Sequence, residues 1–333
     1  MNRVNTDILS TIEKKELFEL LSGSTVLVTG ATGLIGSALI KTLNAANEEY
    51  GFDIKIIGQI RNEEKAKAIF GSIIQNILLT NQFDQPCDYI IHTVSPTASK
   101  FFIEHPVETI KASVESTFAV LESARKHKAN MVYLSSMEQY GVPYNPRENM
   151  SEEKIGIIDH LSVRSSYSES KRMCECMCVS YASEYGVNVK IARLAQTFGA
   201  GMSLSDNRMP MQFARAAAER KDIILHTEGK SISNFVYLTD ALSGILTIMA
   251  HGLPGQAYNV CNDRETRSVK EIAKLVAQEI AEGEIAVRTI IPAQNMGYAA
   301  DVEMYLDSNK LRKLGWEPEV SMAEAYKRLV ETL

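Results

Sequence analysis

The chain has 333 residues, of which 45% are hydrophobic and 23% are charged, and its formal net charge is -6. This composition is ordinary for a globular protein, and the length suffices for one large domain or two modest ones. Because the charge is mild and spread along the sequence, no basic stripe exists that could neutralise a run of phosphates. Nucleic acid is therefore excluded as an expected partner.

The cysteines and the first residues indicate the cellular setting. The five cysteines form no CxxC pair, and no histidine lies at zinc spacing from them, so we expect no metal site and a reducing cytoplasm. Residues 1–21 mix acids and bases without an apolar core, which is unlike a signal peptide. No apolar run approaches the ~20 residues that span a bilayer, so the expectation is a cytoplasmic protein with no membrane partner.

The elements expected along the chain begin with an amphipathic leader helix over residues 8–21, where apolar residues recur at helical spacing. β-rich runs alternating with helical stretches follow at residues 25–29, 54–60, 89–94, 131–135 and 189–194. Such alternation predicts a parallel sheet covered on both faces. The expected fold class is therefore α/β, with a doubly wound parallel sheet.

Beyond Arg193 the order of the elements loosens. Residues 202–220 are typical of a loop and then a helix, 229–237 of a loop and then a strand, and 269–280 of a helix. We expect a smaller α+β lobe here. The predicted organisation is a leader helix at 1–23, a first domain at 24–195 and a second lobe at 196–333, interleaved with the first domain around 234–250.

A glycine motif lies between the first expected strand and the helix after it. Gly30, Gly33 and Gly36 follow the apolar run 25–29, in the sequence TVLVTGATGLIG. Glycine there permits a tight turn and a close approach of backbone to a pyrophosphate, at a helix N-terminus with free N–H groups. The first domain is thus predicted to be a Rossmann-type dinucleotide-binding domain. Its expected cofactor-binding residues are Gly30, Thr32, Gly33, Leu34, Ile35, Gly36, Arg61, Val94 and Lys171.

The second expected strand bears on which dinucleotide binds. An acid that holds the ribose 2′-hydroxyl of NAD is missing from its end, which reads IIGQIRN at 56–62. Arg61 could instead bind a 2′-phosphate or lie against adenine. The cofactor expected is therefore NAD or NADP, and this point leaves both open.

Tyr167 and Lys171 lie four residues apart in a helical stretch, so they share one face of that helix. An ammonium near the phenol stabilises phenolate, which suits Tyr167 to exchange a proton with a hydroxyl as hydride moves to nicotinamide. Ser136 and Glu138 follow the strand-like run 131–135. Ser136 would donate to the reacting oxygen and Glu138 would contact substrate or act as a base. The alternative is a serine-rich loop with a solvated glutamate.

With these residues in place, the chain resembles the extended short-chain dehydrogenases/reductases, the group of nucleotide-sugar epimerases, dehydratases and decarboxylases. It is most similar to UDP-glucuronate decarboxylases. The segments that carry this resemblance are 92–96, 136–138, 164–172, 189–199 and 307–318. The resemblance implies a nucleotide-sugar substrate, transient oxidation of a sugar C4 hydroxyl by bound NAD(P)+, a step at the ketone, and reduction back.

The chain also departs from that group. Met137 stands before Glu138 where 4,6-dehydratases carry an acidic pair, which disfavours dehydration. Ser233 replaces an arginine that commonly binds the diphosphate, and Gln196 and Ser113 stand where asparagine is usual. The expected substrate-binding residues are Ser95, Gln196, Arg208 and Ser233, with Lys230 and Arg264 as other candidate cations.

Three readings of function stay open. The first is an epimerase or decarboxylase that regenerates its bound cofactor in each turnover. The second is an NADPH-dependent reductase of nucleotide 4-ketosugars, and the third is a noncatalytic dinucleotide-binding protein. The resemblance also implies a homodimer through amphipathic helices at residues 106–127 and 167–185, although such faces can simply cover the sheet.

Overall fold

The computed structural model describes residues 2–96, 99–292 and 301–333. Its largest element is a seven-stranded sheet in which all neighbouring strands are parallel. The strands run in the order β3 (Ile77–Thr80), β2 (Lys55–Gln59), β1 (Thr25–Thr29), β4 (Tyr89–His92), β5 (Asn130–Ser136), β7 (Val189–Leu194) and β11 (Ala257–Val260). The doubly wound α/β fold and all five expected strands are confirmed. The edge strands β3 and β11 were not expected.

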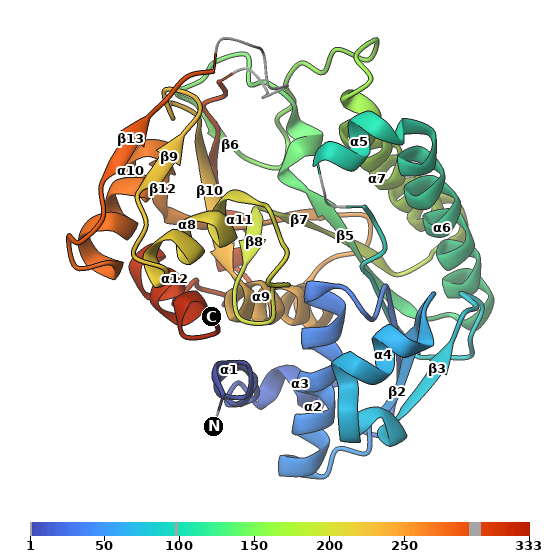
Figure 1. The fold of residues 1–333 in the computed structure, drawn as a ribbon. Helices are drawn as coiled ribbons and strands as arrows, with labels where there is room; N and C mark the ends of the chain where they lie inside the picture. Colours follow the sequence, from blue (N-terminus) through green and yellow to red (C-terminus); the bar gives the residue numbers. More distant parts are fainter. Residues whose placement is uncertain (1, 97–98, 293–300) are drawn as a thin grey trace.

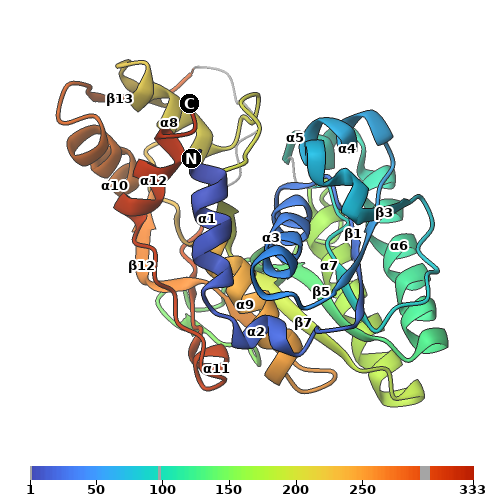
Figure 2. The same ribbon diagram turned by 90° about the horizontal axis from the view of Figure 1, so that it is seen from below.

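Helices cover both faces of this sheet because its strands are apolar on both sides. On one face α3 (Leu34–Tyr50) and α9 (Leu238–His251) pack over Val26 and Val28. On the other face α6 (Pro106–His127) and α7 (Ser165–Tyr185) pack over Leu27 (Figures 1 and 2). Shorter helices connect the strands: α4 (Glu63–Phe70), η1 (Gly71–Asn76), α5 (Ser99–Glu104) and η2 (Met137–Tyr140).

The second lobe has its own apolar core. Its main sheet joins β12 (Asn262–Ser268), β10 (Ile232–Tyr237) and β8 (Gln196–Phe198), and two smaller sheets pair β13 (Val287–Thr289) with β9 (Ile223–Leu225) and β14 (Tyr305–Leu306) with β6 (Asn149–Met150). The helical segments of this half are α8 (Met209–Ala218), α10 (Val269–Leu275), η3 (Val276–Ile280), α11 (Asn309–Arg312) and α12 (Met322–Val330). The expected helix at 202–220 is α8.

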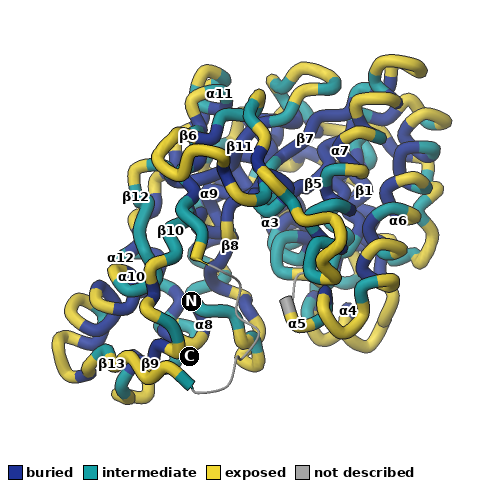
Figure 3. Tube along the Cα trace, turned by 90° about the horizontal axis from the view of Figure 1, so that it is seen from above, coloured by how far each residue is buried: buried dark blue, intermediate teal, exposed yellow. Residues whose placement is uncertain are grey.

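The chain crosses between the two halves more than once. After β10 it enters α9, which is buried on almost every side and packs on β5 and β7 of the first sheet (Figure 3). It then adds β11 to that sheet before β12 returns to the second lobe. The domain boundaries at 23, 195 and 234–250 stay a prediction.

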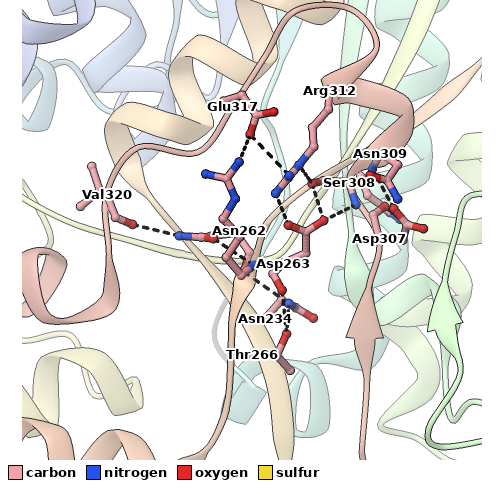
Figure 4. Close-up of polar contacts among 12 residues, drawn as sticks. Asn234, Asn262, Asp263, Thr266, Asp307, Ser308, Asn309, Arg312, Glu317 and Val320 are labelled. Carbon is pink, nitrogen blue, oxygen red and sulfur yellow. Dashed lines mark hydrogen bonds and ion pairs between the residues drawn. The ribbon is translucent and has the colours of Figure 1, made fainter.

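Polar contacts hold the C-terminal segment on the second lobe (Figure 4). Asp263 accepts hydrogen bonds from the backbone N–H of Ser308 at 3.1 Å and from its hydroxyl at 2.7 Å, and it pairs with Arg312. Glu317 pairs with Arg264 at 2.6 Å and with Arg312 at 3.5 Å. We call these five residues the Asp263 cluster.

The leader differs from the single helix expected over 8–21. It consists of α1 (Arg3–Ile12) and the short α2 (Glu16–Glu19). The turn between them lets Leu17, Phe18 and Leu21 reach the apolar core, where all three are buried. Packing against the rest of the protein therefore overrides the continuous helical pattern. None of the helices within the described ranges is long and apolar enough to cross a membrane.

Candidate active site

The glycine motif forms the tight turn that its spacing predicts. Gly30 has φ +62°, and a methyl group on it would lie 2.7 Å from the Thr93 hydroxyl. A methyl group on Gly36, in the first turn of α3, would lie 2.4 Å from the carbonyl oxygen of Gly30. Glycine is required at both positions, because a side chain would push the strand, the turn and the helix apart.

The N-terminus of α3 is open to a ligand. Gly33 is the N-cap residue and has no side chain to accept from the free N–H groups, so the positive end of the helix dipole stays available. A pocket of about 590 Å³ lies in front of it. Of the expected cofactor and substrate residues, it is lined by Gly30, Thr32, Gly33, Arg61, Val94 and Ser95. Leu34, Ile35 and Gly36 form the first turn of α3 behind these residues. This backbone cradle fits a dinucleotide pyrophosphate.

The far end of the pocket carries no acid on β2. Gln59, at the end of β2, is buried and accepts the backbone N–H of Gly30 at 3.2 Å. Arg61 lies just beyond with an exposed side chain that lines the pocket. Sequence reasoning missed Gln59, although its place at the end of the second strand was a usable signal.

Ser136 and Tyr167 meet at the C-terminal end of the central strands. Ser136 ends β5, and Tyr167 lies in the first turn of α7 with its ring stacked on Phe102 at 4.3 Å between centroids. Burial and the neighbouring Glu138 carboxylate raise the pKa of the Tyr167 phenol, while a hydrogen bond to Ser136 and the charge of Arg208 lower it. The net shift is upward, opposite to the lowering expected from the sequence.

Lys171 explains part of that difference. Its ammonium is 3% exposed and donates a hydrogen bond of 2.8 Å to the carbonyl oxygen of Leu134. It lies 5.8 Å from the centroid of the Tyr167 ring. Burial lowers the pKa of Lys171 to about 8, so this group carries only part of its charge above neutral pH. In the protein alone, burial is the largest influence on the pKa of the Tyr167 phenol.

Glu138 follows Ser136 by two residues, and its N–H donates to the Ser136 hydroxyl at 3.2 Å. Burial raises the pKa of its carboxyl, against an opposing effect of Arg164. Arg172, which sequence reasoning missed, fixes this turn by donating to the carbonyl oxygens of Gln139 at 2.7 Å and Tyr140 at 3.0 Å. Its place next to Lys171 was the available signal.

A buried ion pair also fixes the end of β5 and the turn that follows it. Glu175, one turn after Lys171, accepts from the Ser135 hydroxyl at 2.5 Å and pairs with Arg193 of β7 at 2.6 Å. Arg193 also donates to the hydroxyl of Tyr140 at 2.8 Å. The turn that carries Ser136 and Glu138 is thus fixed at both ends. We call Ser135, Ser136, Tyr167, Lys171, Glu175 and Arg193 the Tyr167 cluster.

The expected substrate-binding residues lie in different parts of the structure. Ser95 lines the pocket, with its hydroxyl 3.4 Å from that of Ser113, and Arg208 pairs with Asp206 at 2.9 Å near Tyr167. Gln196 and Ser233 belong to the three-stranded sheet of the second lobe. A shallower pocket of about 470 Å³ beneath α1 contains none of the expected site residues. The roles of the individual site residues stay predictions.

The model of the NAD dependent epimerase/dehydratase family matches residues 26–261. The chain belongs to this family. It is 28% identical to UDP-glucuronic acid decarboxylase 6 of Arabidopsis thaliana, over 95% of this chain and 90% of that protein. The predictions of a family enzyme and of NAD or NADP as its cofactor are thereby confirmed.

Solved structures show the same fold. An epimerase from Methanothermobacter thermautotrophicus matches with a TM-score of 0.78 at 22% identity, covering 94% of this chain and 93% of that one. A dTDP-glucose 4,6-dehydratase from Bacillus anthracis, crystallised in complex with NAD, matches with a TM-score of 0.74 at 17% identity, covering 92% and 95%.

Proposed function

We propose that this family member acts on a nucleotide sugar, as an epimerase or decarboxylase that oxidises the sugar C4 hydroxyl and later reduces the ketone with the same cofactor. The observation that carries the proposal is the cluster of Ser136, Tyr167 and Lys171 at the C-terminal end of β5, on the same edge of the parallel sheet as the glycine motif. It has the side chains that a reversible alcohol oxidation needs, and a noncatalytic binding protein has no use for them.

The protein's own groups have distinct tasks in this reaction. Tyr167 takes up the proton of the C4 hydroxyl, and Ser136 donates a hydrogen bond to the same oxygen. Bound NAD(P)+ supplies a hydride acceptor for the C4 hydrogen. Lys171 is well placed to hold the nicotinamide ribose, as the family resemblance implies. In the reverse direction Tyr167 returns the proton.

The step between oxidation and reduction follows from the ketone. A carboxylate on C5 makes the C4 ketone a β-keto acid, so the C5–carboxylate bond can break with release of CO2, and its electron pair forms an enolate. A proton added to C5 then restores the ketone for reduction. Burial raises the pKa of Glu138, and a carboxyl group in such a setting suits proton transfer to this carbon. The decarboxylase name of the Arabidopsis relative supports testing uronates first.

The test begins with the nucleotide that the purified protein releases on denaturation, identified by mass spectrometry. The protein is then incubated with UDP-, dTDP-, GDP- and CDP-linked sugars and uronates without added cofactor. We expect bound NAD(P) and a product with changed mass or retention time. An empty site, with no conversion of any sugar even after NAD(P)+ is added, would contradict the proposal.

A second candidate is an NADPH-dependent reductase of nucleotide 4-ketosugars. The observation that favours it is Arg61, whose exposed side chain lines the pocket where β2 carries no acid. For this candidate the wild type would turn over only when NADPH and a ketosugar are supplied. Arg61→Ala would then raise the KM for NADPH about tenfold and leave that for NADH unchanged.

We further propose a cytoplasmic homodimer joined through α6 and α7. The outer faces of these helices expose large apolar side chains: Val107, Ile110, Phe118, Met173, Val179 and Tyr185. Two copies meeting there would bury them in a bundle of four helices. Sedimentation equilibrium is expected to give twice the mass of the 36.9 kDa chain.

A further inference from the structure

The leader helix α1 lies between the two halves of the protein, against α3 and α9 on one side and near α12 of the second lobe on the other (Figure 2). Its Asp7 is only 4% exposed, which is rare for a carboxylate unless it has partners. Asp7 accepts from the hydroxyl of Tyr237 at 2.5 Å and pairs with Arg3 at 2.8 Å and Arg328 at 3.5 Å. One side chain of the leader thus contacts β10 and α12.

Tyr237 extends this contact into the loop that follows β8. Its hydroxyl oxygen accepts the N–H of Ala200 at 3.4 Å. A phenol has one proton, and because the Asp7 carboxylate can only accept, that proton is directed to Asp7 and a lone pair is left for Ala200. Gly199 packs on the same tyrosine, since a methyl group there would lie 3.0 Å from the ring.

The loop 199–208 borders the candidate active site on two sides. Gly201 faces Leu34, the first residue of α3, with 3.8 Å between a methyl group placed on the glycine and the leucine side chain. At the other end of the loop, Arg208 donates to the carbonyl oxygen of Thr197 in β8 at 3.4 Å, and its charge lowers the pKa of Tyr167. A shift of this loop would therefore move Arg208 relative to Tyr167.

We infer that Asp7 is a positioning residue, which fixes the hydroxyl of Tyr237 and thereby holds the loop 199–208 in place beside the dinucleotide helix and Tyr167. The role in turnover rests on the proposed function, whereas the role in ordering the loop does not. A simple structural tether would stabilise α1 without affecting the loop, and this difference can be measured.

Hydrogen–deuterium exchange of the whole chain tests the ordering directly. Asp7→Ala and Tyr237→Phe should each raise amide exchange in peptides covering 199–204 about tenfold, with exchange around 30–36 unchanged. Amide exchange in the double variant should be close to that in either single variant, because the two residues act through one contact. Glu13→Gln, an exposed residue at the end of α1, is the matched control and should change nothing.

Kinetics with a nucleotide sugar that the wild type converts give the second readout. Displacement of Arg208 should raise the KM for that sugar about five- to tenfold, with kcat within about twofold and bound cofactor retained. Unchanged exchange in the loop, or an equal rise throughout the chain, would overturn the inference. If the wild type converts no sugar, the proposed function fails, and the exchange experiment still decides the role of Asp7.

Discussion

The Tyr167 cluster and the Asp263 cluster are both polar, but they differ in how far their charged groups are buried. In the first, Lys171 is 3% exposed, and the side chains of Glu175 and Arg193 are 9% and 11% exposed. In the second, Asp263 and Arg312 are about one-fifth exposed and Glu317 is half-exposed. Water can therefore compensate a lost partner for the charged groups of the second cluster, but not for those of the first.

The difference separates two uses of polar groups. The Tyr167 cluster desolvates its charges at the end of β5, where a shifted pKa serves proton transfer. The Asp263 cluster joins the segment after β14 to β12 and leaves its charged groups partly exposed to water. We therefore expect substitutions in the first to change chemistry or cost much stability, and those in the second to loosen one segment.

The largest effect is expected from Tyr167→Phe. Loss of the hydroxyl removes the group that exchanges the proton, so kcat should fall by about 10²–10⁴-fold while the bound nucleotide is retained. Single-turnover formation of reduced cofactor is the measurement. Tyr326→Phe, at a buried tyrosine in the apolar core of the second lobe, is the control. Full activity of Tyr167→Phe would remove it from the proposed chemistry.

The next largest effect is expected from Arg193→Met. The change leaves the carboxylate of Glu175 buried without its ion-pair partner, which should lower the free energy of unfolding by about 3–5 kcal/mol. Urea unfolding measures it. Arg125→Met breaks the exposed pair with Glu122, whose atoms are 2.7 Å apart, and should cost below about 1 kcal/mol. Equal costs for the two variants would show that burial does not distinguish these pairs.

A smaller effect is expected from Asp263→Ala. Ser308 and Arg312 lose their acceptor; water reaches Arg312, which is one-fifth exposed, whereas Ser308 is fully buried, so the cost should be about 1–3 kcal/mol. Limited proteolysis should then cut first within the segment from 307 to 320. If the variant instead loses as much stability as Arg193→Met, the exposed cluster supports the whole fold rather than one segment.

The first half of the fold could be predicted because its signals are local. Apolar strands, the glycine motif and the Tyr167 and Lys171 pair each lie within one short stretch of sequence. The edge strand β3 was missed because Leu78 is exposed there, and β11 because the buried Asn259 looks polar. Tyr140, one of the partners that make Asn259 acceptable in the core, lies 119 residues away.

The residues of the candidate site likewise divide into those with a local sequence signal and those held by distant contacts. Ser136, Tyr167 and Lys171 were predicted and lie together, because their spacing on one strand end and one helix face fixes them. Arg172 was missed although it stands next to Lys171, because no sequence pattern identifies its partners, which are backbone carbonyls. Asp7 was missed since Tyr237 is 230 residues away. Contacts of that kind depend on the packing of whole elements.

The smallest expected effect is on thermal stability, and it comes from the cost of burying the Lys171 ammonium. Its pKa is about 8 in the folded protein, against about 10.4 in an unfolded chain, so between these values the unfolded state binds more protons. The wild type therefore gains stability as pH rises from about 8 to 10.4, and below pH 8 it carries the full cost of a buried ammonium.

Lys171→Met removes that cost together with the activity. Its Tm should exceed that of the wild type by about 2–6 °C at pH 7, and the difference should shrink as pH rises through the window from about 8 to 10.4. Lys55→Met, at an exposed lysine that begins β2, should show no such trend. A Tm difference that does not change with pH would mean that Lys171 is already neutral at pH 7, or that methionine is accommodated for reasons of packing alone. Either result would show that the charge of Lys171 does not determine the stability cost of burying this side chain.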